Sequence, residues 1–159
     1  MDQKALFMKF WDREATTTRK VLARIPDGSQ YTPDPKSRPA REIAWQITVE
    51  MKAIGEGIAR GTIEWEMPPA PATMKDVMSA YDAQHEDLSA RLHATAAERW
   101  EAKLPFMVGD KVLNDSATCF DNAWGFLFDI IHHRGQITTY LRAMGSTVPQ
   151  VYGPTADEP

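Results

Sequence analysis

The chain of 159 residues has the size of a single domain, long enough to enclose one hydrophobic core and too short for two. Its composition of 43% hydrophobic and 25% charged residues is typical of a soluble globular protein. A net charge of -4 argues against the broad basic surface that holds nucleic acid. The single cysteine, Cys119, excludes an intramolecular disulfide and a thiolate metal cluster.

The N-terminal segment mixes charged residues among its apolar ones every few positions. That pattern lacks the apolar core of a signal peptide, and no stretch of the sequence approaches the length of a membrane span. We therefore expect one domain over residues 1–159, located in the cytoplasm, with neither nucleic acid nor membrane as a partner.

Two helices are predicted in the first half of the chain. Apolar residues recur at helical spacing over residues 2–25, and the run IPDGSQYTPDPKSRP then ends the helix because its prolines and glycine disfavour helical backbone. A three-four repeat of apolar residues from Ala40 to Ile58 predicts a second helix over residues 38–60.

Two more helices are predicted in the second half. After the proline-rich run GTIEWEMPPAPA, an apolar stripe from Met74 to Leu92 predicts the third helix. The segment ERWEAKLPFMVGDKV stays open between a loop and a short turn, because it contains a proline and a glycine. From about Ser116, with Asp115 beside it as a candidate cap, helical character continues to Gly145, a plausible stop. These four helices predict an all-α four-helix bundle with irregular connectors and a C-terminal tail.

The inward face of the fourth predicted helix carries an unusual number of polar residues. Asp129 and His133 stand at i and i+4, which brings their side chains onto one face about 6 Å apart. Gln136 lies close to the same arc, whereas His132 points about 100° away from His133, toward the rim. Each buried polar group without a partner costs about 1–3 kcal/mol, so this face implies a compensating interaction.

The second and third helices add polar groups to the same interior. Glu50 falls inside the apolar arc of the second helix with Gln46 at its edge, and His85 lies on the inward stripe of the third. These residues fit either a metal site or a hydrogen-bonded cluster, and His85 alone fits an ordinary core histidine. Arg134 is interpreted as complementing the helix dipole, and Tyr152 in the tail as contacting a ligand or packing on the bundle.

The run HHRGQITTYLRAMG followed by VPQVYGP resembles the last helix and tail of the DinB/YfiT-like superfamily. Upstream, VLARIPDGSQYTPDPKSRPAREIAWQI is similar to the end of the family's first helix, its proline-containing loop and the start of its second helix. The resemblance implies a four-helix bundle that is commonly a dimer. It also implies a divalent metal, often nickel or zinc, held by one histidine on the second helix and two at i and i+4 on the fourth.

Two of these three ligands differ in this sequence. Gln46 takes the position of the histidine on the second helix, Asp129 takes that of the first histidine on the fourth, and His133 is retained. A glutamine carbonyl is a poorer ligand than imidazole for zinc or nickel, while aspartate is a competent ligand that adds one negative charge. We therefore expect weaker binding of nickel or zinc and a place for manganese, with Glu50 or His85 as possible helpers.

The resemblance suggests a metal-dependent hydrolase, or a transferase that adds a low-molecular-weight thiol to an electrophile, acting on a small molecule. Glu50 and Tyr140 are then the candidates for moving a proton or orienting a ligand. The alternative is a non-catalytic dimeric bundle, a binding or stress-response protein, whose metal site has decayed so that Gln46 donates to Asp129. Exposed aromatic residues on the first helix are the local hint of a dimer.

Overall fold

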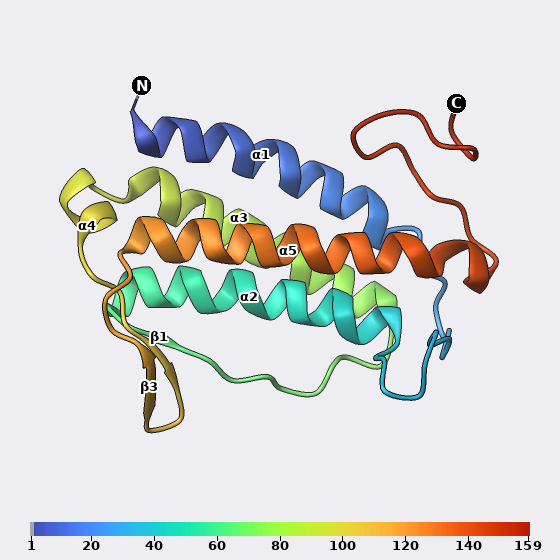
Figure 1. Ribbon diagram of the computed structural model, residues 1–159, viewed down its shortest axis with the longest axis horizontal. Helices are drawn as coiled ribbons and strands as arrows, with labels where there is room; N and C mark the ends of the chain where they lie inside the picture. Colours follow the sequence, from blue (N-terminus) through green and yellow to red (C-terminus); the bar gives the residue numbers. More distant parts are fainter. Residues whose placement is uncertain (1) are drawn as a thin grey trace.

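Four long helices run side by side along the molecule (Figure 1). The computed structural model describes residues 2–159. Within the bundle, the second long helix packs between the third and the last, and the first packs against the last. The expectation of a mostly helical protein is confirmed. The long helices are α1 (Gln3–Leu22), α2 (Ala40–Arg60), α3 (Met74–Ala94) and α5 (Cys119–Leu141).

The helix ends follow from local hydrogen bonding. The N-cap of α5 is Thr118 and not the predicted Ser116, because the Thr118 hydroxyl accepts from the Asp121 N–H and the Asp121 carboxylate accepts from the Thr118 N–H. The first helix ends at Leu22, three residues earlier than predicted. After α5 a short 3-10 helix, η1 (Arg142–Met144), leads to Gly145, whose φ of 77° confirms the predicted stop.

A small three-stranded sheet corrects the prediction of an all-α fold. It extends from one end of the bundle, with β1 parallel to β2 and β2 antiparallel to β3 (Figure 1). Strands this short carry too few residues for a period-two pattern to be visible in the sequence. The sheet and the short helix before it occupy most of the segment that sequence reasoning left open. Their bounds are α4 (Ala97–Glu101), β1 (Ile63–Glu64), β2 (Phe106–Val108) and β3 (Lys111–Asn114).

A buried ion pair joins α1 to α5. Arg134 and Glu14 are 2% and 1% exposed, and Arg134 Nη1 lies 2.8 Å from Glu14 Oε2. Arg134 also donates to the Thr18 hydroxyl and to the Tyr152 hydroxyl, which in turn donates to Glu14 at 2.7 Å. The interpretation of Arg134 as a partner of the helix dipole is therefore wrong, since its charge is matched inside the core.

The C-terminal tail folds back over the bundle and is held there by polar contacts. In addition to the Tyr152 hydrogen bonds, two ion pairs hold the tail: Asp157 with Arg142 at 3.0 Å, and Glu158 with Arg24. Of the two roles considered for Tyr152, packing on the bundle is the one observed. Among the helices formed by residues 2–159, none has both the length and the apolar character that crossing a membrane requires.

Candidate metal centre and cleft

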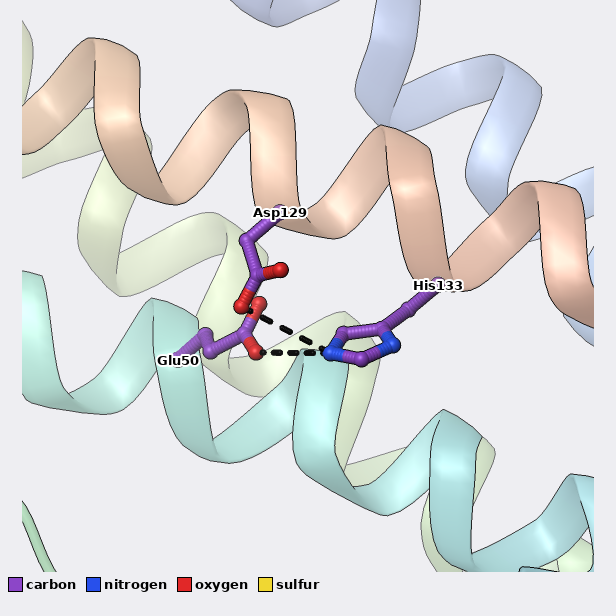
Figure 2. A group of neighbouring side chains, drawn as sticks. All are labelled: Glu50, Asp129 and His133. Atoms are coloured by element: carbon purple, nitrogen blue, oxygen red, sulfur yellow. Dashed lines mark ion pairs between the residues drawn. The ribbon is translucent and has the colours of Figure 1, made fainter. Parts of the chain in front are cut away.

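Glu50, Asp129 and His133 converge between α2 and α5 (Figure 2). Asp129 and His133 come from successive turns of α5, as their spacing predicts, and Glu50 reaches them from α2. His133 Nε2 lies 3.5 Å from Asp129 Oδ2 and 3.6 Å from Glu50 Oε1. One possible ligand atom from each residue lies within 4.8 Å of the other two. That separation is compatible with three groups sharing one cation.

The hydrogen bonds of His133 orient its ring. Nδ1 lies 2.8 Å from Gln136 Oε1, which can only accept, so Nδ1 carries the proton. Nε2 then carries a lone pair, which accepts from the amide nitrogen of Gln46 and faces the two carboxylates. An imidazole held in this tautomer by a partner on its far nitrogen is the usual form of a metal-binding histidine.

Glu50 is the least compensated group of the cluster. The residue is 1% exposed; the Gln46 amide donates to Oε1 at 2.8 Å, while Oε2 finds no hydrogen-bond partner among residues 2–159. Burial raises the pKa of Glu50 to about 9, an effect that the Gln46 hydrogen bond reduces and the negative charge of Asp129 increases.

A divalent ion fits the chemistry of these donors. It would give Glu50 Oε2 the partner that it lacks, and two carboxylates would match its charge. Carboxylate oxygens with one imidazole suit zinc or manganese, and are harder donors than the three histidines that the family resemblance implies.

An open cleft of about 720 Å³ lies over the two carboxylates. Gln46, Glu50 and Asp129 contribute its polar part, and the Asp129 side chain is half exposed there. An aromatic wall faces them, formed by Trp65, which follows β1, Phe106 of β2 and Phe126 of α5. Phe126 lies 6.4 Å from Trp65 and 6.1 Å from Phe106 between ring centroids. The small sheet and the residue that follows its first strand therefore supply two of the three aromatic side chains of the wall.

The other candidates from the sequence lie in different places. Gln46 belongs to the cluster, but its amide nitrogen faces His133 and Glu50. To bind a metal, the side-chain amide would have to flip so that its oxygen faces the cluster. Tyr140 is buried against Tyr31 and does not line the cleft, so its catalytic role stays a prediction. His132 is exposed at the rim of the cleft, as helical geometry predicts.

His85 does not belong to the cluster. Its ring stacks with those of Trp11 and Tyr81, and Nε2 lies 3.3 Å from the Ser89 hydroxyl. Burial lowers the pKa of His85, although nearby acidic residues oppose the shift. Of the two roles considered for this histidine, packing outside the cluster is the one observed, with the side chain partly exposed at the edge of the core.

The comparisons with known proteins agree with this geometry. The sequence model of the DinB family matches residues 128–159, a stretch that contains Asp129, His133 and Gln136. The Bacillus subtilis protein YrdA is 27% identical to this chain over 162 residues, which cover 96% of this chain and 89% of YrdA. The match to the DinB family model agrees with the resemblance to the DinB/YfiT-like superfamily stated from the sequence.

Two solved structures share the fold. A DinB-like protein from Bacillus cereus ATCC 10987 superposes with a TM-score of 0.75 at 20% identity, covering 92% of this chain and 95% of its own. The DinB-like protein YjoA from Bacillus subtilis gives a TM-score of 0.70 at 17% identity, covering 92% and 97%. At these identities the likeness is one of fold.

Proposed function

We propose that this protein is a divalent-metal-dependent hydrolase of small molecules, with Glu50, Asp129 and His133 as the metal ligands. One observation carries the proposal: a buried carboxylate, with an oxygen that has no partner among residues 2–159, lies beside a second carboxylate and a histidine lone pair, and both carboxylates line an open cleft. A protein that used these residues only for stability would lose free energy by leaving Glu50 Oε2 unpaired.

Different residues of this chain would have different roles at such a metal site. Gln136 holds the His133 ring so that Nε2 faces the carboxylates, and Gln46 orients Glu50. The aromatic wall packs against the apolar part of a substrate and excludes water around it. When bound, a divalent ion supplies a Lewis acid that polarises a carbonyl group or lowers the pKa of a water. The open cleft leaves access to that position.

A second candidate function is supported by the internal hydrogen bonds of the cluster. Gln46 bonds to both Glu50 and His133, and His133 bonds to Gln136, so most of the polar groups have partners without a metal. A non-catalytic bundle that binds a small molecule in the cleft is consistent with these contacts. The unpartnered Glu50 oxygen favours the metal site over this alternative.

Two further expectations stay predictions. Thiol transfer rests on the family resemblance, since none of the contacts above selects for a thiol. Dimerisation also rests on the family resemblance, since Phe7 and Trp11 of α1 are buried in the core at 1% and 3% exposure and only Phe10 of the aromatic residues on that helix is partly exposed.

The test is metal binding measured by isothermal titration calorimetry on untagged, metal-free protein with zinc, nickel and manganese. We expect one metal per chain, with binding lost in His133→Ala and retained in His93→Ala, an exposed histidine on α3. Metal at 100 times its dissociation constant should stabilise the fold by about 2.7 kcal/mol. If no metal binds at micromolar concentration, the hydrolase proposal fails and the metal-free binding bundle takes its place. If metal binds, ester and amide substrates are then screened for turnover that a chelator abolishes.

A further inference from the structure

One face of α5 forms a side of the cleft. Asp121, Gly125, Asp129 and His132 line it at intervals of three or four residues, so they occupy a single stripe of the helix. Asp121 is charged at neutral pH, because hydrogen bonds from the Thr118 backbone and side chain lower its pKa. The stripe therefore adds a carboxylate to those of Glu50 and Asp129.

The charge of the cleft is of one sign. Three acidic side chains line it, those of Glu50, Asp121 and Asp129, and no lysine or arginine among residues 2–159 does. Arg38 acts on Glu50 electrostatically but is not part of the lining. A divalent ion held by Glu50 and Asp129 would match their charge and leave that of Asp121 unbalanced. The cleft thus repels anions with or without a metal.

The aromatic wall adds a preference of its own. The ring faces of Trp, Tyr and Phe attract cations, and Trp does so best. Trp65 and Phe126 belong to the same wall and line the cleft together with Glu50, whose Oε2 has no partner in the described part of the chain. A cleft with aromatic rings, unbalanced carboxylates and no lining cation matches a molecule that is both positively charged and apolar.

We propose that this cleft binds a small organic cation, an ammonium group on an apolar or aromatic body, and rejects anionic molecules. For the reaction, the inference rests on the proposed hydrolase function: the substrate would be an ester or amide of such an amine. For binding it stands on the cleft alone. It also argues against thiols that carry carboxylate groups as substrates, since no lysine or arginine of the described residues lines the cleft to match the charge of those groups.

Gly125 offers a way to close the cleft without disturbing the core. A Cβ built at Gly125 meets no described heavy atom within 4 Å, and the residue lines the cleft. Gly125→Leu should therefore fill the cleft, and it removes the entropic cost of a glycine inside a helix. Gly135→Leu is the matched control, because Gly135 lies on the same helix in equally open space and away from this cleft.

The charge of the cleft is changed separately with Asp121→Asn. An asparagine oxygen can still accept the capping hydrogen bonds from Thr118, so the helix end is preserved. Asp76→Asn is the matched control, since Asp76 likewise accepts from the Thr73 hydroxyl and donates its N–H to that hydroxyl at the start of α3, and it lines no part of the cleft.

The experiment follows nitrogen-15 amide shifts of metal-free and zinc-loaded protein titrated with benzyltrimethylammonium, benzyl alcohol and benzenesulfonate. We expect the cation to bind about tenfold more tightly than the alcohol. The sulfonate should bind more weakly than the alcohol. Gly125→Leu should abolish binding of the cation and Gly135→Leu should leave it unchanged. Asp121→Asn should lower the affinity for the cation by about fivefold and leave the affinity for the alcohol unchanged. Asp76→Asn should change neither affinity.

The proposal is overturned if the sulfonate binds as tightly as the cation, if none of the probes shifts residues of the cleft, or if Gly125→Leu binds the cation normally. Its failure is distinguishable from that of the hydrolase proposal. Metal binding with the reverse order of probes would remove only the inference on substrate charge. The expected order of probes without metal binding would remove only the hydrolase.

Discussion

His133 and Arg134 are neighbours in the chain, yet they belong to two buried polar clusters on different sides of α5. Arg134 faces α1, where the charge of Glu14 matches its own and the hydrogen bonds involving Thr18 and Tyr152 complete the network. His133 faces α2, where it lies near the carboxyl groups of Glu50 and of Asp129 from its own helix, and one oxygen of Glu50 has no partner among residues 2–159. One cluster is complete within the chain and the other lacks a positive charge.

The two buried glutamates show the difference most clearly. Burial alone would raise the pKa of Glu14, but hydrogen bonds from Tyr152, Arg134 and Arg13 outweigh it, so the pKa is lowered. For Glu50 burial prevails, and the pKa rises to about 9. A buried carboxylate whose charge is matched within the protein stabilises the fold. A buried carboxyl group with no cationic partner is better explained by a ligand that supplies the missing positive charge.

The largest expected effect removes the charge match of the first cluster. Arg134→Met leaves Glu14 buried without its ion pair and should cost about 3–5 kcal/mol of unfolding free energy. Urea denaturation at neutral pH measures it. The double variant Arg134→Met with Glu14→Leu should recover much of the loss, because no unpaired charge is then buried. A loss below about 1 kcal/mol in the single variant would contradict the described role of the pair.

The second prediction concerns the pH dependence of the metal-free protein. The pKa of Glu50 is about 9 in the folded state against an ordinary 4.5, so its favourable contribution is complete below pH 4.5 and is lost as the pH rises toward 9. By pH 7 this loss amounts to about 3 kcal/mol. Glu50→Gln should flatten that dependence, measured by urea denaturation with a chelator at pH 5, 7 and 9.

Glu56→Gln serves as the control for that variant. Glu56 is on the same helix but partly exposed, and it pairs with Lys52 and Arg60. Its substitution should leave the pH profile as in the wild type. An unchanged profile in Glu50→Gln would mean that the buried carboxyl does not titrate as described.

The third prediction separates the orientation of His133 from its ability to bind metal. Gln136→Leu removes the acceptor of the Nδ1 proton and leaves Nε2 in place, so metal affinity should fall about 10- to 100-fold without disappearing. Calorimetry gives the affinity, and nitrogen-15 shifts of the imidazole in the metal-free protein should show loss of the single tautomer. A full retention of affinity would show that the ring is held by packing alone.

The smallest expected effect lies in the tail. Tyr152→Phe removes the hydroxyl that links Arg134 to Glu14 but keeps the ion pair, so it should cost only about 1 kcal/mol. Limited proteolysis should then cut the tail faster than in the wild type. If the unfolding free energy falls as far as in Arg134→Met, then the tyrosine hydroxyl, and not the ion pair, supplies most of the stability of the first cluster.

The sequence was sufficient where the relevant contacts are local. Helical periodicity placed the four long helices, and the i, i+4 spacing of Asp129 and His133 predicted their proximity because both lie on one helix. Glu50 was found as a polar residue inside an apolar arc. The orientation of the Gln136 amide was not predictable, since periodicity gives the face of a helix and not the hydrogen bond.

What sequence reasoning missed depends on contacts between distant segments. The strands of the sheet are two to four residues long, so their pairing, and with it the aromatic wall from Trp65 and Phe106, left no periodic signal. Arg134 was misinterpreted because its partner Glu14 lies 120 positions earlier, on another helix. Helical geometry relates residues within one helix but does not predict which other helix packs against that helix.

The separation of Glu14 and Arg134 also bears on how the protein is made. A ribosome produces α1 first, and 120 residues must be added before the partner of Glu14 exists. Until then Glu14 has only the largely exposed Arg13 beside it, so its carboxylate cannot be enclosed with a matching buried charge while α2 and α3 are synthesised. Closure of the bundle around this ion pair is therefore a late event of translation that awaits the arrival of α5.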